Sequence, residues 1–257
     1  MSPLISFILL CSAALCEQPE PRTVLRAEMV LLFQNPDGGW PKNVGWNSFE
    51  TLSDAKEGFK KFLKRKSTID NSATYTQIRE LAAAYTKTNN PDYREAARRG
   101  LEFILREQRR SGGWRGSDVD AITFNDDAMI GVMRLLKEIT QKQSTFRWVK
   151  PAERERCQQA LARALRVLLD CQIVVDGKKT AWCQQHDHET LKPLKARSYE
   201  LPSISGVESV KIVRYLMEEE APSAEIVEAI ERELPGAIVR LEDLTGGQDH
   251  WSAVVIA

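Results

Sequence analysis

The chain has 257 residues, of which 42% are hydrophobic and 28% charged, and its 36 basic and 36 acidic side chains leave no formal net charge. This composition is typical of an ordinary folded protein and excludes a disordered one. The absence of net positive charge argues against nucleic acid as the main partner, because phosphate binding requires an excess of basic residues. The length suits one large domain or two small ones.

A short apolar run occupies residues 4–15 at the start of the chain. It is too short to span a bilayer, and no other segment is apolar enough to do so, so no membrane partner is expected. Small residues near Ala14 and Cys16 fit a secretory signal, although no Lys or Arg precedes the run. We expect a signal peptide at residues 1–16, a secreted or periplasmic protein and a single domain at residues 17–257. A buried N-terminal helix is the alternative.

Apolar residues recur at steps of three and four along most of the remaining chain, which is the spacing of one helix face. These stripes lie at residues 75–85, 93–108, 129–139, 157–168 and 210–217. Asn90 and Pro91 supply an N-cap and a first turn before the second stripe. No long alternating strand pattern competes, but residues 172–177 can form a short hairpin with its turn at Asp176 and Gly177.

A glutamine, a turn and a tryptophan recur at the ends of predicted helices. The copies run from Gln34 to Trp40, from Gln108 to Trp114 and, with a longer turn, from Gln172 to Trp182. Repeated helical hairpins of this period predict a ring of paired helices. The expected fold is all-α, an α/α toroid in the form of an incomplete (α/α) barrel, with short β or irregular loops. Trp40 and Trp114 are expected to pack inside it.

The cysteines and histidines give no pattern of a transition-metal site. Cys157, Cys171 and Cys183 lie outside the expected signal, and their odd number without a CxxC pair predicts neither a disulfide framework nor a zinc site. The segment His186-Asp187-His188 lacks the spacing of zinc ligands on a helix. We expect Cys157 and Cys171 to be core residues of one helix.

Polar clusters precede three of the apolar stripes. They are Asp70-Asn71, Asn125-Asp126-Asp127 and the segment 195–203. A single Asp or Asn at such a place is often an N-cap, but the adjacent Asp126 and Asp127 exceed what one cap requires. We expect these helix starts to lie at the same end of the ring, where the acidic oxygens converge on a hard cation such as Ca²⁺.

Arg197 is the other candidate functional residue. A surface ion pair is its simplest interpretation. Its neighbours favour an anionic ligand, because Lys195 and Lys192 form a basic patch with it before the helix. Trp182 and His186 lie a few residues earlier, and the Trp182 ring is expected either to stack on a sugar or to pack in the core.

The segments that hold these residues resemble the pectate lyases of polysaccharide lyase family 10. The resemblance extends from about residue 35 to Glu231 and is carried by residues 38–43, 68–71, 122–129, 180–187 and 195–203. It implies a helical toroid that cleaves α-1,4-linked galacturonan by calcium-assisted β-elimination and releases unsaturated oligogalacturonides. The implied partner is polygalacturonate, the implied cofactor is Ca²⁺, and we expect a monomer.

The resemblance also implies roles for individual residues. Asp126 and Asp127 occupy the calcium-binding acidic pair of the family, and Asp70 matches an acidic residue beside the calcium and the substrate. Arg197 matches the arginine taken to be the catalytic base, which implies an alkaline optimum because the pKa of arginine exceeds ~12. The expected substrate-binding residues are Asn71, Lys195, Tyr199, His186 and Trp182.

Two segments depart from the family pattern. The loop at residues 112–121 is shorter than usual, and after Glu231 the substrate-binding arginines of the family have no clear counterparts, so we expect a truncated or divergent C-terminus. A non-catalytic or weakly active pectin-binding α/α module is therefore one alternative function. A toroid of the terpenoid cyclase or prenyltransferase kind is another, for which Asp118-Val119-Asp120 is a poor acidic motif.

Overall fold

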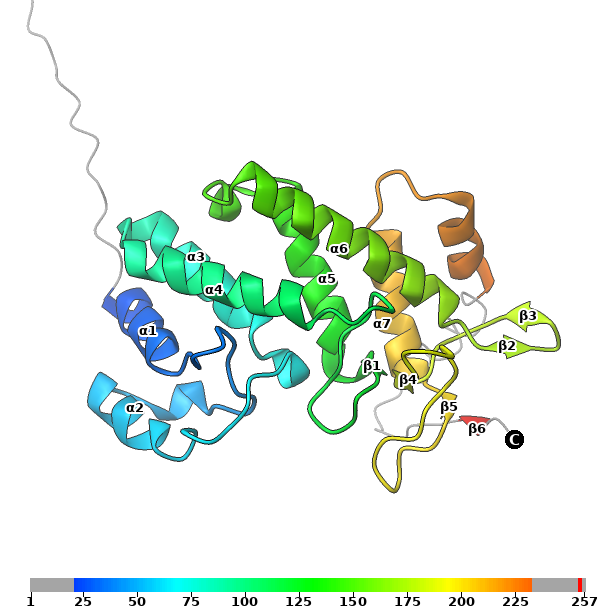
Figure 1. Ribbon diagram of the computed structural model, residues 1–257, viewed down its shortest axis with the longest axis horizontal. Coiled ribbons are helices and arrows are strands. Elements are labelled where there is room, and N and C mark those ends of the chain that lie inside the picture. Colours follow the sequence, from blue (N-terminus) through cyan, green and yellow to red (C-terminus); the bar gives the residue numbers. More distant parts are fainter. Residues whose placement is uncertain (1–20, 233–253, 256–257) are drawn as a thin grey trace, which may run out of the picture.

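The computed structural model describes residues 21–232 and 254–255, so the expected signal peptide and most of the divergent C-terminal segment lie outside the described residues. The fold is all-α, and its helical hairpins follow one another as parts of a toroid (Figure 1). No helix in the part that the structure describes is long and apolar enough to cross a membrane. The helices are α1 (Pro21–Leu32), α2 (Leu52–Phe59), α3 (Tyr75–Thr88), α4 (Pro91–Glu107), α5 (Ala128–Thr140), α6 (Pro151–Asp170), α7 (Gly206–Met217) and a further helical stretch at residues 224–232.

The strands are two residues long and form antiparallel pairs. The pairs are β1 (Ile122–Thr123) with β4 (Gln185–His186), β2 (Val174–Val175) with β3 (Lys178–Lys179), and β5 (Ser203–Ile204) with β6 (Val254–Val255). The predicted hairpin is confirmed as β2 and β3, and its turn residues Asp176 and Gly177 have φ of 49° and 74°. Positive φ at both turn residues gives a two-residue turn whose twist matches the right-handed twist of the flanking strands.

The repeated tryptophans lock each turn onto the helix before it. Each indole N–H donates to a main-chain carbonyl at 2.7–2.8 Å, in the pairs Trp40 to Val30, Trp114 to Ile104 and Trp182 to Leu168. Trp40 and Trp114 are buried, so their predicted packing role is confirmed. These bonds give each buried indole N–H an acceptor, because buried polar groups are almost always hydrogen-bonded.

The first two repeated glutamines join neighbouring hairpins, whereas among the described residues the Gln172 amide donates within its own turn, to Thr180 at 2.9 Å. The Gln34 amide donates at 2.8 Å both to Gly38 in its own turn and to Ala96 in α4. Gln108 makes the corresponding pair of 2.8 Å bonds, to Gly112 and to Ala160 in α6. The same sequence motif thus joins the end of α1 to α4 and the end of α4 to α6.

Most positions of the predicted stripes form the core, but Met217 at the end of the stripe 210–217 is 60% exposed, and Leu161 and Leu165 are only partly buried. The apolar positions of α4 and α5 are buried, and so are the reduced Cys157 and Cys171, as the sequence predicts. Asn90 caps α4 by accepting from the Asp92 amide at 3.0 Å, also as predicted. Helices α3 and α5 approach closely at Gly131, where a Cβ atom would lie 2.2 Å from the ring of Tyr75. This approach holds the first turns of the two helices beside each other.

Candidate active site

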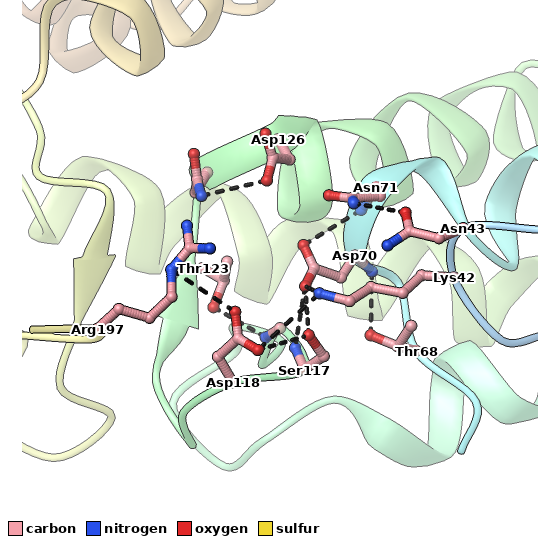
Figure 2. Close-up of polar contacts among 12 residues, drawn as sticks. Lys42, Asn43, Thr68, Asp70, Asn71, Ser117, Asp118, Thr123, Asp126 and Arg197 are labelled. Carbon is pink, nitrogen blue, oxygen red and sulfur yellow. Dashed lines mark hydrogen bonds and ion pairs between the residues drawn. The ribbon is translucent and has the colours of Figure 1, made fainter. Parts of the chain in front are cut away.

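The two acidic clusters lie beside each other at the starts of α3 and α5 (Figure 2). They form the short 3-10 turns η2 (Asp70–Ser72) and η3 (Asn125–Asp127). The amide of Thr68 donates to the Trp40 carbonyl, and that of Thr123 to the Trp114 carbonyl, so each tryptophan turn also positions one cluster. The prediction that the clusters share one end of the toroid is confirmed.

The backbone of both clusters is strained in the same way. Asn71 and Ser72 have φ of 48° and 62°, and Asp126 and Asp127 have φ of 53° and 56°. Consecutive non-glycine residues rarely adopt this left-handed conformation, which costs about 1–3 kcal/mol for each residue and is concentrated at functional sites. Asp127 makes no side-chain cap bond to α5, so simple N-capping does not account for this acidic pair.

Asp70 is a buried carboxylate that a lysine and a serine hold. Its Oδ2 accepts from Lys42 Nζ at 2.7 Å and from Ser117 Oγ at 2.6 Å. Burial alone would raise the pKa of Asp70, but the hydrogen bonds from Lys42 and Ser117 outweigh it and hold the pKa below its ordinary value. Asp70 is therefore ionised and already paired.

Asp126 and Asp127 have different surroundings. Asp126 is exposed and, within residues 21–232, accepts a hydrogen bond only from the side-chain amide of Asn125, at 3.2 Å. Partial desolvation of its carboxyl group, together with the nearby negative charge of Asp70, raises the pKa of Asp126 above its ordinary value although the residue as a whole is exposed. Asp127 Oδ2 lies 3.2 Å from Lys211 Nζ, whereas its Oδ1 is buried and has no hydrogen-bond partner in residues 21–232. Asp126 is thus the carboxylate most open to a cation.

Arg197 faces this cluster from the loop before β5 (Figure 2). Its guanidinium pairs with Glu200, whose Oε2 also accepts from the Arg197 amide at 3.1 Å. Its Nε lies 4.0 Å from Asp118 Oδ2, and the other oxygen of Asp118 lies 4.0 Å from Lys42 Nζ. Arg197 is therefore connected to Asp70 through Asp118 and Lys42, and the expected convergence of acidic oxygens with one guanidinium is found.

The charge state of Arg197 follows from Glu200. The hydrogen bond from the Arg197 guanidinium to the Glu200 carboxylate raises the pKa of the arginine above its ordinary value. The same bond lowers the pKa of Glu200. In this arrangement Arg197 is a cation, and any role as a base requires the guanidinium to leave Glu200.

Several site residues have only weak signals in the sequence. Lys42, Ser117, Asp118 and Glu200 complete the polar network, yet none of them is among the predicted site residues. Lys42 and Glu200 lie inside the segments 38–43 and 195–203 that carry the resemblance, and this placement was the available signal. Ser117 and Asp118 belong to the short loop at residues 112–121, whose path only the tertiary structure reveals.

Two of the predicted substrate contacts are wrong. Trp182 and His186 are both 0% exposed, so neither ring offers a face to a sugar. The indole of Trp182 serves the structural bond to Leu168, and His186 accepts from the Cys183 amide at 3.0 Å and contacts the Leu191 carbonyl at 2.8 Å. The other predicted contacts, Asn71, Lys195 and Tyr199, are exposed.

The buried imidazole of His186 makes the fold sensitive to mild acid. Burial lowers the pKa of His186 to about 4, whereas an unfolded histidine has a pKa of about 6.5. The unfolded state therefore binds the extra proton first, and stability falls as the pH drops from about 6.5 to about 4, by roughly 3 kcal/mol. The free energy of unfolding, measured with urea across this pH range, is expected to fall more steeply for the wild type than for His186→Gln, which does not titrate. Equal pH dependence in the two proteins would contradict the lowered pKa of His186.

The acidic site offers carboxylate oxygens to a metal ion. Within residues 21–232 and 254–255, no group of three or more His, Cys, Asp or Glu side chains could by itself hold a metal. Calcium is coordinated by about six to eight oxygens, and some of these can come from substrate or water. Two adjacent carboxylates, one of them with a buried oxygen that lacks a partner, fit such an ion if the substrate and water supply the remaining ligands.

Comparisons with known proteins identify the family and the fold of the chain. The family described as pectic acid lyase matches residues 34–236. The family 10 polysaccharide lyase from Cellvibrio cellulosa is 32% identical with a TM-score of 0.72, over 82% of this chain and 65% of that chain. A mutant of a family 10 polysaccharide lyase from the same organism, in complex with trigalacturonic acid, is 30% identical with a TM-score of 0.73, over 85% of this chain and 68% of that chain. No curated protein sequence matches the chain. From its matched residues and its fold, the chain belongs to the pectic acid lyase family and shares the toroid of the family 10 polysaccharide lyases.

Proposed function

We propose that the chain cleaves α-1,4-linked galacturonan by calcium-assisted β-elimination and releases unsaturated oligogalacturonides. The observation that supports this most strongly is the network that joins Asp70, Lys42, Asp118 and Arg197 beside the open carboxylate of Asp126. The trigalacturonic acid bound to the mutant relative supports a galacturonate substrate. Family membership argues against the terpenoid cyclase alternative.

The residue types suit an elimination. The reaction removes the proton on C5 of a galacturonate and expels the oxygen on C4, and it consumes no water, so the paired acids of a glycoside hydrolase are not needed. Arg197 is proposed to accept the C5 proton. Since Glu200 holds the guanidinium in its protonated form, the competent species is a minority that increases with pH, and we expect an alkaline optimum.

Asp126 is proposed as the main calcium ligand, with Asp127 as the second and Asp70 beside them. Among the residues that the structure describes, no cation lies within hydrogen-bond distance of Asp126, whereas Lys211 pairs with Asp127 and Lys42 pairs with Asp70. The ion, when bound, would withdraw negative charge from the substrate carboxylate next to C5. Lys42 and Ser117 keep the Asp70 carboxylate ionised and oriented.

Exposed groups around the cluster are proposed to hold the polymer. Lys195 offers a positive charge to a uronate carboxylate, and Asn71 offers an amide that already donates to Asn43 at 2.8 Å. Tyr199 is 70% exposed, and its ring lies 4.9 Å from the guanidinium carbon of Arg197, which leaves it accessible for a sugar contact. Secretion and a monomeric state stay predictions. Secretion would bring the protein to a polymeric substrate outside the cell.

An absorbance assay tests the proposal directly. The purified protein is incubated with polygalacturonate at alkaline pH, and the ultraviolet absorbance of the unsaturated uronate is followed. We expect product in the presence of Ca²⁺, loss of activity with a chelator and recovery when calcium is restored. Binding of the polymer without product at any alkaline pH would favour the non-catalytic module instead, and the absence of binding would overturn both.

A further inference from the structure

Basic side chains are concentrated on α2 and on the turns that follow it, at the end of the molecule beside α1 (Figure 1). We call this stretch the basic segment, and its members are Lys56, Lys60, Lys61, Lys64, Arg65 and Lys66. All six are exposed. Within residues 21–232, only Lys60 among them forms an ion pair, with Glu57 at 2.6 Å. The segment therefore carries a local excess of positive charge, although the whole chain has no net charge.

Aromatic packing fixes the other side of the basic segment to the core. The ring centres of Phe59 and Phe62 lie 5.1 and 5.5 Å from that of Phe33, just after α1. The Phe62 amide donates to the Phe59 carbonyl at 2.8 Å, and the Arg65 amide donates to the Phe62 carbonyl at 2.8 Å, so tight turns continue beyond the helix. The apolar side chains are thus held inward while the basic ones face the solvent.

The basic segment leads directly into the acidic site. Lys66 precedes Asp70 by four residues, which span at most ~14 Å even in an extended chain. The Arg65 carbonyl accepts from the Asn35 amide at 3.0 Å, and the Thr68 amide donates to the Trp40 carbonyl at 3.1 Å. These bonds hold the connection against the first tryptophan turn. An elongated ligand in the acidic site therefore has this basic surface within reach.

The chemistry of the basic segment favours an anionic polymer. Clustered like charges repel one another, and an anionic partner relieves the repulsion. Lysine is a flexible point charge, which suits carboxylates repeated along a chain better than one fixed anion. A membrane surface fits less well, because a helix that binds lipid needs a continuous apolar face. Leu63, at 64% exposed, is the one large apolar side chain that the segment exposes in the described structure.

We propose that the basic segment binds the carboxylates of a galacturonan chain outside the acidic site, so that one polymer molecule contacts both places. The identity of the polymer rests on the proposed function. Two linked contacts bind a long chain more tightly than either contact alone, because the second contact forms at a high effective concentration. The protein then prefers long, unesterified galacturonan over short oligomers and over methyl-esterified pectin.

Titration of fluorescently labelled polygalacturonate with the full chain tests the proposal, with calcium chelated so that no cleavage occurs. The variant combines Lys61→Gln, Lys64→Gln and Lys66→Gln. We expect its affinity for the polymer to fall about tenfold at low salt, as the loss of three exposed charge pairs implies. Its affinity should also depend less steeply on salt, because fewer counterions are released on binding. Highly methyl-esterified pectin should bind equally to both proteins.

A second triple variant is the matched control. It combines Lys87→Gln, Lys142→Gln and Lys178→Gln, which remove the same charge from exposed positions on α3, after α5 and on β3. This control should bind the polymer as the wild type does. The melting temperatures of both variants should equal or exceed that of the wild type, since only exposed cations are replaced. An equal loss of affinity in the control would assign the effect to net charge and overturn the proposal.

The remaining outcomes separate this proposal from the lyase function. Unchanged polymer affinity in the Lys61, Lys64 and Lys66 variant would overturn the basic segment, whether or not the wild type cleaves the polymer. If that variant instead loses only binding to phosphatidylserine vesicles, the segment is a membrane surface and the proposal fails. If it loses polymer affinity but the wild type never forms product with calcium, the segment stands and the lyase function fails.

Discussion

Replacement of Arg197 by alanine or by lysine is expected to remove nearly all turnover while calcium affinity is retained. Loss of a general base typically reduces the rate by about 10²–10⁴-fold. Lysine keeps the charge, but it lacks the planar fork that pairs with Glu200 and faces Asp118, so its nitrogen does not reach the same position. Initial rates from the absorbance of the unsaturated product measure the first effect, and calorimetric titration with Ca²⁺ measures the second.

Arg166→Lys is the matched control for this experiment. Arg166 is an exposed arginine on α6 that pairs with Asp170, and this bond raises its pKa just as Glu200 raises that of Arg197. Because Arg166 lies outside the polar network, its replacement should leave the rate near that of the wild type. Wild-type turnover in Arg197→Lys would remove Arg197 from the role of base.

Asp126→Asn is expected to have the next largest effect, a loss of calcium-dependent activity on the order of 10²-fold. Asparagine preserves the shape of the side chain and tolerates the positive φ of 53° at this position, so the fold should survive. The substitution removes the negative charge of the carboxylate that would bind the ion. The measurement is the calcium concentration for half-maximal rate, together with the rate at saturating calcium.

Two further variants make this result specific. Asp176→Asn changes an exposed aspartate that also has a positive φ, of 49°, in the β2–β3 turn, and it should behave as wild type. Asp127→Asn should weaken calcium binding less than Asp126→Asn, since Lys211 already pairs with one Asp127 oxygen. An unaltered calcium dependence in Asp126→Asn would show that the ion is held elsewhere.

The repeated motifs predict the fold because their contacts are local. A Gln-to-Trp turn closes through bonds such as those from Trp114 to Ile104 and from Gln108 to Gly112, within about ten residues. Each helix then buries its apolar face by packing against the neighbouring hairpin. The convergence of the clusters that contain Asp70 and Asp126 follows from the same repeat, since one precedes α3 and the other precedes α5.

The sequence by itself therefore determined the all-α toroid, its hairpin repeat and the acidic and basic segments that meet at one end. Only the tertiary structure decided which of their side chains are available. Trp182 and His186 lie in a recognised motif yet are buried, whereas Asp118, from the atypical loop, stands 4.0 Å from both Arg197 and Lys42. Burial and pairing depend on contacts between residues far apart in the chain, and a pattern of local spacing contains no information about them.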